Sequence, residues 1–169
     1  MLHPAPVNLG PDAGAAAFAS TLQAEQDALD AFIGLLQNEQ EVLIKGDPER
    51  LAAIAPDKAA QIDLLALLDN RRKRHLSEQN LPDSVEGMQS WINRNLGSAT
   101  VVRRIWRELL ARANTAHQLN LSNGRLIEHW MQQNRMKLTV LQTATASDNL
   151  YRADGQLRPL RSARSLDQA

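Results

Sequence analysis

Leucines recur every seven residues along the first patterned part of the chain. The series is Leu22, Leu29, Leu36 and Leu43, and the same stripe is widened by Phe18, Phe32, Ile33 and Val42. Because apolar residues at this spacing lie on one face of an α-helix, the pattern predicts one long helix with a continuous buried seam. The pattern ends at Gly46. Asp47-Pro48 then suits the start of a second helix, since Asp can cap it and Pro fits its first position.

The second helix keeps the apolar pattern but contains a proline. Its apolar positions are Leu51, Ile54, Ile62, Leu65, Leu68 and Leu76. A proline inside a helix removes a hydrogen bond and clashes with the preceding turn, so Pro56 predicts a kink or a break near Ala55. Beyond it, Ser84 can cap a short helix that ends before Gly97. The apolar residues of that short helix are Val85, Met88, Trp91 and Ile92.

The longest run starts at Ser98 or Thr100 and keeps one phase. On a seven-residue grid its face reads Val102, Trp106, Leu109, Ala113, Ala116, Asn120, Asn123, Ile127, Trp130, Asn134, Lys137 and Leu141. Asn123-Gly124 is a dipeptide typical of tight turns, but a turn there would reset the phase. The pattern therefore predicts a helix that runs through Gly124, which then needs a reason such as close approach of another backbone.

Three amides stand on this predicted face. Asn120, Asn123 and Asn134 need hydrogen-bond partners if they are buried, and asparagine at such positions commonly fixes the register of packed helices. Together with Gly124, they are the candidate register residues.

These patterns place the chain in the all-α class, as long antiparallel helices that form a coiled-coil-like hairpin or bundle. Residues 1–14, rich in Pro and Gly, are expected to be a flexible lead-in, and 15–146 the helical body. Residues 147–169 are rich in Arg, Gly, Pro and Ser, which predicts a flexible recognition tail that orders on a partner.

The zero net charge hides a division along the chain. Residues 1–70 carry 11 acidic and 3 basic residues, whereas residues 71–169 carry 8 acidic and 16 basic ones. Complementary charges on neighbouring helices are the favoured explanation, and a basic surface for an acidic partner is the alternative. The basic run 71–74 has no flanking aromatic residue, so a solvated helix end is favoured over a nucleic-acid patch.

Catalytic and metal-binding patterns are missing from the sequence. The chain has no cysteine, no phosphate-binding glycine loop and no Glu-x-x-His pair. His117 and His129 lie twelve residues apart on one helix, too far to share a metal ion. We therefore expect no enzyme activity, no catalytic residue, no cofactor and no metal. The start of the chain is no convincing signal peptide and no apolar stretch could span a membrane, so a cytoplasmic location without membrane insertion is expected.

Two motifs carry a resemblance to a known family. They are Leu119-Asn120-Leu121-Ser122-Asn123-Gly124-Arg125-Leu126-Ile127 and Leu150-Tyr151-Arg152-Ala153-Asp154-Gly155-Gln156. With the Leu-rich hairpin upstream, they resemble the FlgN family of flagellar type III export chaperones. The resemblance implies a helical protein that holds the hook-associated proteins FlgK and FlgL unpolymerised and brings them to the export apparatus, without catalysis or a cofactor.

The resemblance also assigns candidate sites. Family members bind cargo through their C-terminal region, and an amphipathic helix there can cover the polymerising segments of the cargo. The candidate cargo contacts are Leu126, Ile127, Trp130, Leu138, Leu141 and Leu150. By resemblance Tyr151 docks to the export gate component FlhA, together with Asp154, Gly155 and Gln156 of the same motif.

Two other classes remain open on the sequence alone. A self-associating coiled-coil scaffold without export cargo would use the asparagines to set a homodimer's register, whereas a chaperone could be a monomer. A nucleic-acid binder that uses the basic run ranks last, and we expect no nucleic-acid partner.

Overall fold

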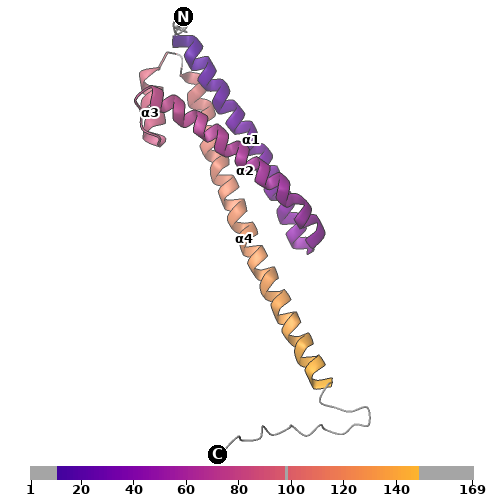
Figure 1. Ribbon diagram of the computed structural model, residues 1–169. Coiled ribbons are helices and arrows are strands. Elements are labelled where there is room, and N and C mark those ends of the chain that lie inside the picture. Colours follow the sequence, from indigo (N-terminus) through magenta and orange to yellow (C-terminus); the bar gives the residue numbers. More distant parts are fainter. Residues whose placement is uncertain (1–10, 98, 149–169) are drawn as a thin grey trace, which may run out of the picture. The chain divides into compact units, whose positions relative to one another are not determined.

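The computed structural model describes residues 11–97 and 99–148, and these residues contain helices and no strand. The four helices are α1 (Pro11–Lys45), α2 (Pro48–Glu78), α3 (Val85–Arg94) and α4 (Thr100–Asp148) (Figure 1). The all-α prediction is confirmed. Residues 11–14 of the predicted lead-in lie in α1, and residues 147 and 148 of the predicted tail lie in α4. The chain divides into two units, residues 1–127 and 128–169, and α4 contributes to both.

The turn between α1 and α2 is built as the sequence predicts. Gly46 has a φ of 69°, a left-handed conformation that strains residues with a Cβ atom, and its N–H donates to the Val42 carbonyl at 3.0 Å. The Asp47 carboxylate accepts a hydrogen bond from the Arg50 N–H at 3.0 Å. The glycine therefore ends α1, and the aspartate caps α2.

In unit 1, α1 and α2 form an antiparallel hairpin. Lys58 contacts Glu39 and Arg72 contacts Glu25. A higher residue number on α2 is therefore paired with a lower one on α1, as in an antiparallel pair. Between these two pairs, the side-chain N–H of Gln61 donates to a carbonyl of α1. This is the antiparallel helical hairpin that the leucine pattern predicts.

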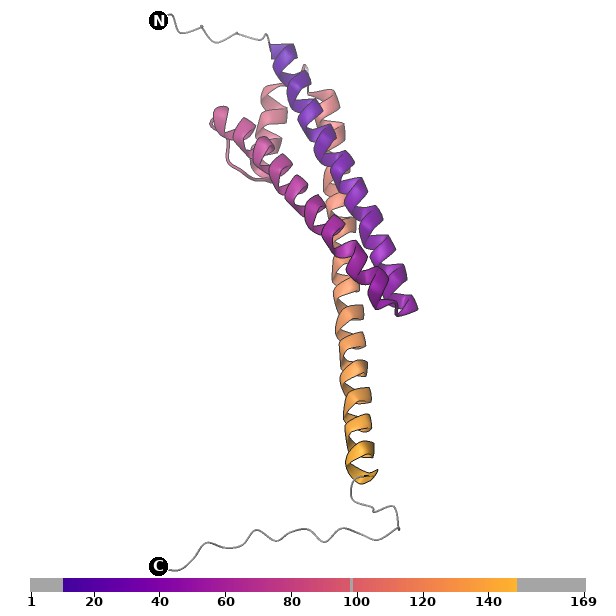
Figure 2. The same ribbon diagram turned by 45° about the vertical axis from the view of Figure 1, so that its right-hand side comes forward.

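The first part of α4 runs parallel to α1. Gln26 contacts Glu108 and Asp30 contacts Arg112, while Gln40 donates to the Ser122 hydroxyl. The partners in all three pairs are 82 positions apart, and a constant offset means that the two helices run in the same direction. Both ribbon views show α1 beside this part of α4 (Figures 1 and 2). Helix α2 ends beside the start of α1, where His75 stacks on Phe18, so α4 begins at the same end of the hairpin as α1.

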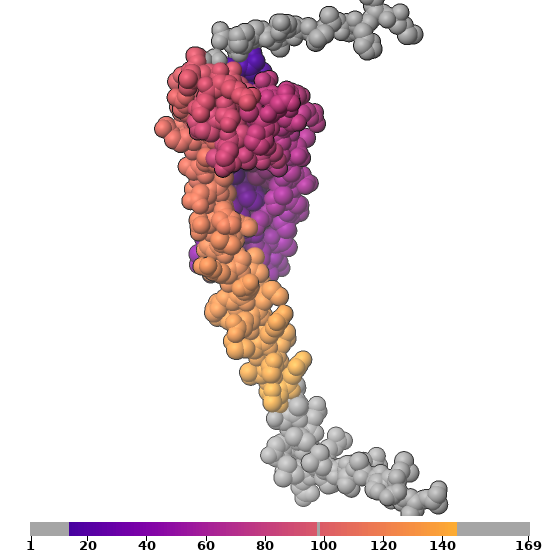
Figure 3. Space-filling view, turned by 90° about the vertical axis from the view of Figure 1, so that its left-hand side faces the viewer, coloured from indigo at the N-terminus to yellow at the C-terminus, as the bar shows by residue number. Residues whose placement is uncertain are grey.

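Helix α3 closes that end of unit 1. The Ser84 hydroxyl accepts a hydrogen bond from the Gly87 N–H at 3.2 Å, which caps the helix as predicted. Trp91 reaches the Phe18 ring, with 4.8 Å between the ring centroids. In the space-filling view, α2, α3 and the start of α4 form a continuous surface here (Figure 3). Val85 was expected on the buried face but lies exposed.

In unit 1, the residues predicted to form the buried face of α4 are confirmed only in part. The series at 102, 109, 116 and 123 is buried, and Trp106 of the second series is buried too, but the second series is not kept at the next two positions. Ala113 and Asn120 are exposed, whereas Ile105 is buried and Leu119 is half-buried. Ile105 and Leu119 bring more apolar surface than an alanine and an amide, so the helix is rotated toward them.

Two expectations for α2 are wrong. The helix is not broken near Ala55, because Pro56 lies inside a continuous α2. Pro56 and the residue four positions before it are exposed, so the backbone carbonyl that loses its donor can face water. Ile62 is exposed instead of buried, and the neighbouring Gln61 turns toward α1 to donate to the Ala28 carbonyl at 2.7 Å.

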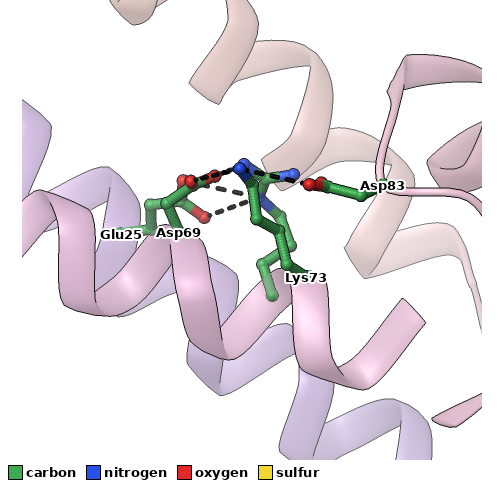
Figure 4. A network of polar contacts seen from close by, with 5 residues as sticks. Glu25, Asp69, Lys73 and Asp83 are labelled. Carbon is green, nitrogen blue, oxygen red and sulfur yellow. Dashed lines mark hydrogen bonds and ion pairs between the residues drawn. The ribbon is translucent and has the colours of Figure 1, made fainter. Parts of the chain in front are cut away.

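The basic run 71–74 is partly built into unit 1. Arg72 contacts Glu25 and Asp69, and Lys73 contacts Asp69 and Asp83 (Figure 4). The Arg72 guanidinium also lies 5.1 Å from the centroid of the Trp106 ring. Burial raises the pKa of the Glu25 carboxyl despite the neighbouring Arg72. These contacts agree with complementary charges on neighbouring helices.

Candidate functional site

The family-like motif at 119–127 contains a buried polar contact that joins three helices. Asn123 is 1% exposed, and its Nδ2 donates to the Leu36 carbonyl and to the Glu39 carboxylate, each at 2.8 Å. Lys58 of α2 donates to the same carboxylate at 2.8 Å. We call Asn123, Glu39 and Lys58, with the Leu36 carbonyl, the junction layer. It explains an amide on an apolar face, since the amide is hydrogen-bonded to α1.

For the other residues of this motif, one prediction is confirmed and two are wrong. Helix α4 runs through Asn123 and Gly124, so the predicted continuity is confirmed. A Cβ atom at Gly124 would meet nothing within 4 Å, and close approach of another backbone is therefore the wrong explanation for this glycine. Asn120 and Asn134 are exposed, and only Asn123 of the three candidate register amides is buried.

A half-buried histidine lies elsewhere in unit 1, at the end closed by α3. The His75 ring stacks on Phe18 with 3.9 Å between centroids and an interplanar angle of 16°. Its Nε2 is buried without a hydrogen-bond partner among the described residues. Burial lowers the pKa of His75, and the charge of Glu78 opposes this effect. Burial therefore disfavours the charged form of this ring.

Unit 2 presents a helix with exposed apolar side chains. Every residue from 128 to 144 is exposed except Trp130, which is half-buried. The large apolar residues among them are Met131, Met136, Leu138, Val140 and Leu141, with exposed fractions between 48% and 67%. Exposed apolar residues gathered in one segment mark an interaction surface, whereas single ones are ordinary.

The exposed apolar residues of unit 2 lie on two faces. Met131 and Leu138 are seven residues apart and Leu141 follows three residues later, so the three share one face of the helix, and we call them the apolar stripe. Met136 and Val140 lie on another face. With Gln133 and Lys137 they line a shallow hollow. A helix that is apolar on more than one side is suited to burial between partners.

The structure places the predicted cargo contacts in three settings. Leu126 and Ile127 are half-buried in unit 1, Trp130 is half-buried in unit 2, and Leu138 and Leu141 are exposed in unit 2. Leu150 and the predicted gate-docking residues lie outside the described residues; the latter are Tyr151, Asp154, Gly155 and Gln156.

Sequence reasoning missed three exposed apolar residues of unit 2. They are Met131, Met136 and Val140, none of which was among the predicted cargo contacts. The sequence does hold a signal for Met131, since it precedes Leu138 by seven residues. Methionine is flexible and polarisable, so it adapts to varied apolar partners.

In residues 11–97 and 99–148, no three His, Asp or Glu side chains are grouped so that they could hold a metal ion. No helix in this part of the chain is both long and apolar enough to cross a membrane.

Comparison with known proteins gives one match. The sequence model of the FlgN protein family matches residues 14–159, which includes the motif at 119–127 and the exposed helix of unit 2. No match was found among curated proteins or among solved structures. The match covers most of the chain. The chain therefore belongs to the FlgN family of flagellar export chaperones.

Proposed function

We propose that this chain is a cytoplasmic chaperone that binds FlgK/FlgL-like hook-associated proteins, prevents their premature assembly and delivers them to the flagellar export gate. One observation carries the proposal. In a member of the FlgN family, the helix of unit 2 exposes large apolar side chains between Met131 and Leu141. Such a surface is suited to an amphipathic helix of a partner.

Binding in this proposal buries the apolar stripe. Burying one large apolar side chain contributes about 1.5–3 kcal/mol, so Met131, Leu138 and Leu141 together can supply much of the affinity. Leu126, Ile127 and Trp130 are half-buried and have less surface left to cover. Leu138 and Leu141 are therefore the stronger of the proposed contacts.

Gate docking is the second part of the proposal. By resemblance, Tyr151 and its neighbours Asp154, Gly155 and Gln156 contact FlhA, while the apolar stripe holds cargo. An aromatic side chain in a polar segment often anchors an interface. Two separate sites would let cargo and gate be bound at the same time.

Titration of a purified FlgK-like protein with variants of the full chain tests cargo binding. The double variant Met131→Ser and Leu138→Ser should bind at least about tenfold more weakly, because two apolar anchors are lost. Leu121→Ser is the matched control, since Leu121 is an exposed leucine of α4 in unit 1. Unchanged affinity of the double variant, with its helicity intact, would refute the cargo assignment.

The same titration with FlhA separates the two proposed sites. Tyr151→Ala should weaken FlhA binding and leave the affinity for the FlgK-like protein unchanged. Equal loss of both affinities would reject the proposed division between the apolar stripe and Tyr151.

A further inference from the structure

Asn123-Gly124 is the one Asn-Gly dipeptide in the sequence. In a flexible chain, asparagine before glycine is prone to deamidation, because glycine has no side chain to hinder attack by its own backbone nitrogen. The remaining asparagines precede larger residues; Asn120, for example, precedes a leucine. The dipeptide with the greatest intrinsic reactivity therefore lies inside the junction layer.

The reaction needs only water. The backbone nitrogen of Gly124 attacks the side-chain carbon Cγ of Asn123 and gives up its proton, the Cγ–Nδ2 bond breaks, and the leaving NH2 group takes up a proton and departs as ammonia. The resulting succinimide ring is opened by a water molecule, which gives aspartate or isoaspartate at position 123. The net change is loss of ammonia and gain of water, without an oxidant or a reductant.

The fold of unit 1 opposes each step. The leaving nitrogen Nδ2 donates to both Leu36 and Glu39, and the side chain is 1% exposed, which limits access of water. The backbone of Gly124 lies within continuous α4, where helical geometry prevents the ring closure. Reaction therefore requires α4 to leave α1 locally.

The product does not fit the junction layer. A carboxylate at position 123 has no N–H to donate to Leu36, and it would lie beside the Glu39 carboxylate. Lys58 already pairs with Glu39, so a second buried negative charge there would be uncompensated. The Oδ1 atom of Asn123 has no hydrogen-bond partner in the described part of the chain, so the amide is held by the two donations that deamidation removes.

We propose that Asn123 is a conditional deamidation site, protected while the junction layer is closed and reactive when α4 separates from α1, and that its modification prevents the layer from forming again. The modification would turn a reversible opening of unit 1 into a permanent one. The proposal is independent of cargo binding.

The rate of modification in the full chain tests the first half. Wild-type protein is incubated at neutral pH in buffer and in urea, and peptide 113–125, released by cleavage after arginine, is analysed by mass spectrometry. Asn123 should be modified at least about tenfold faster in urea, because the closed state must open first. Asn114 and Asn120 of the same peptide are internal controls that should stay amides. Equal rates for Asn123 in the two conditions would overturn the proposal.

Refolding of the aged protein tests the second half. After incubation in urea and dilution, chains modified at position 123 should remain in the unfolded fraction, while unmodified chains regain their helical circular dichroism. Gly124→Ala is the matched control, since it removes the reactive dipeptide and should refold fully after the same treatment. Asn123→Asp should melt far below Asn120→Asp, or fail to fold. Refolding of modified chains to the wild-type melting temperature would contradict the proposal.

Discussion

At Asn123 the free-energy cost of burying a polar side chain is offset by two hydrogen bonds to α1. An amide buried without partners costs about 1–3 kcal/mol, and here Nδ2 reaches the Leu36 carbonyl and the Glu39 carboxylate. The sequence predicts that this amide needs partners. It could not predict which ones, because they lie more than 80 positions away and depend on the parallel offset between α1 and α4.

Removing the amide tests the energetic role of the junction layer. Asn123→Ala should lower the free energy of unfolding by about 1–3 kcal/mol, since Glu39 loses a donor and remains buried. Urea denaturation followed by circular dichroism measures this change. Asn120→Ala, at an exposed amide of the same motif, should stay within about 0.5 kcal/mol of wild type. Equal effects of the two substitutions would contradict the assigned role.

His75 should make stability depend on pH. Burial lowers its pKa in the folded state below the ordinary value of 6.5, so the unfolded chain binds more protons just below that pH. The free energy of unfolding should therefore fall as the pH decreases from 6.5 toward the lowered pKa. His75→Phe keeps the stacking on Phe18 and should flatten this part of the profile. Parallel profiles for wild type and variant would show that His75 contributes nothing to the dependence.

At the scale of the helices, starts and stops were predictable from local chemistry. Gly46, Asp47 and Ser84 act within a few residues of their own position, so their effects can be read from the sequence. The continuity of α2 through Pro56 and the rotation of α4 could not be predicted in this way. Both depend on which side of a helix faces water, and the packing of unit 1 decides that.

Alanine at two helical glycines should change the free energy of unfolding in opposite directions. Gly124→Ala should raise the free energy of unfolding by about 1 kcal/mol, because alanine favours a helix and its Cβ atom would meet nothing within 4 Å. Gly87→Ala should lower it, since a Cβ atom there would overlap the Pro82 carbonyl. Thermal melting of both variants is the measurement. A destabilised Gly124→Ala would show that this glycine has a role in the fold that its surroundings do not reveal.

At the scale of the whole molecule, some of the opposite charges of the two sequence halves pair inside unit 1. Acidic residues of α1 contact basic residues of α2 and α4, as in the pairs Glu25–Arg72 and Asp30–Arg112. Sequence reasoning found the exposed Leu138 and Leu141 but not Met131. It also included Leu126 and Ile127, which are half-buried, because a periodic pattern cannot separate an internal face from a binding face.

Hydrogen–deuterium exchange of the full chain, with and without a FlgK-like protein, tests the central claim that unit 1 is a self-supporting fold and that the helix of unit 2 binds cargo. Cargo should increase the protection of backbone amides between residues 128 and 148 and leave those of α1, α2 and α3 unchanged. Increased protection confined to unit 1, with none between residues 128 and 148, would contradict it.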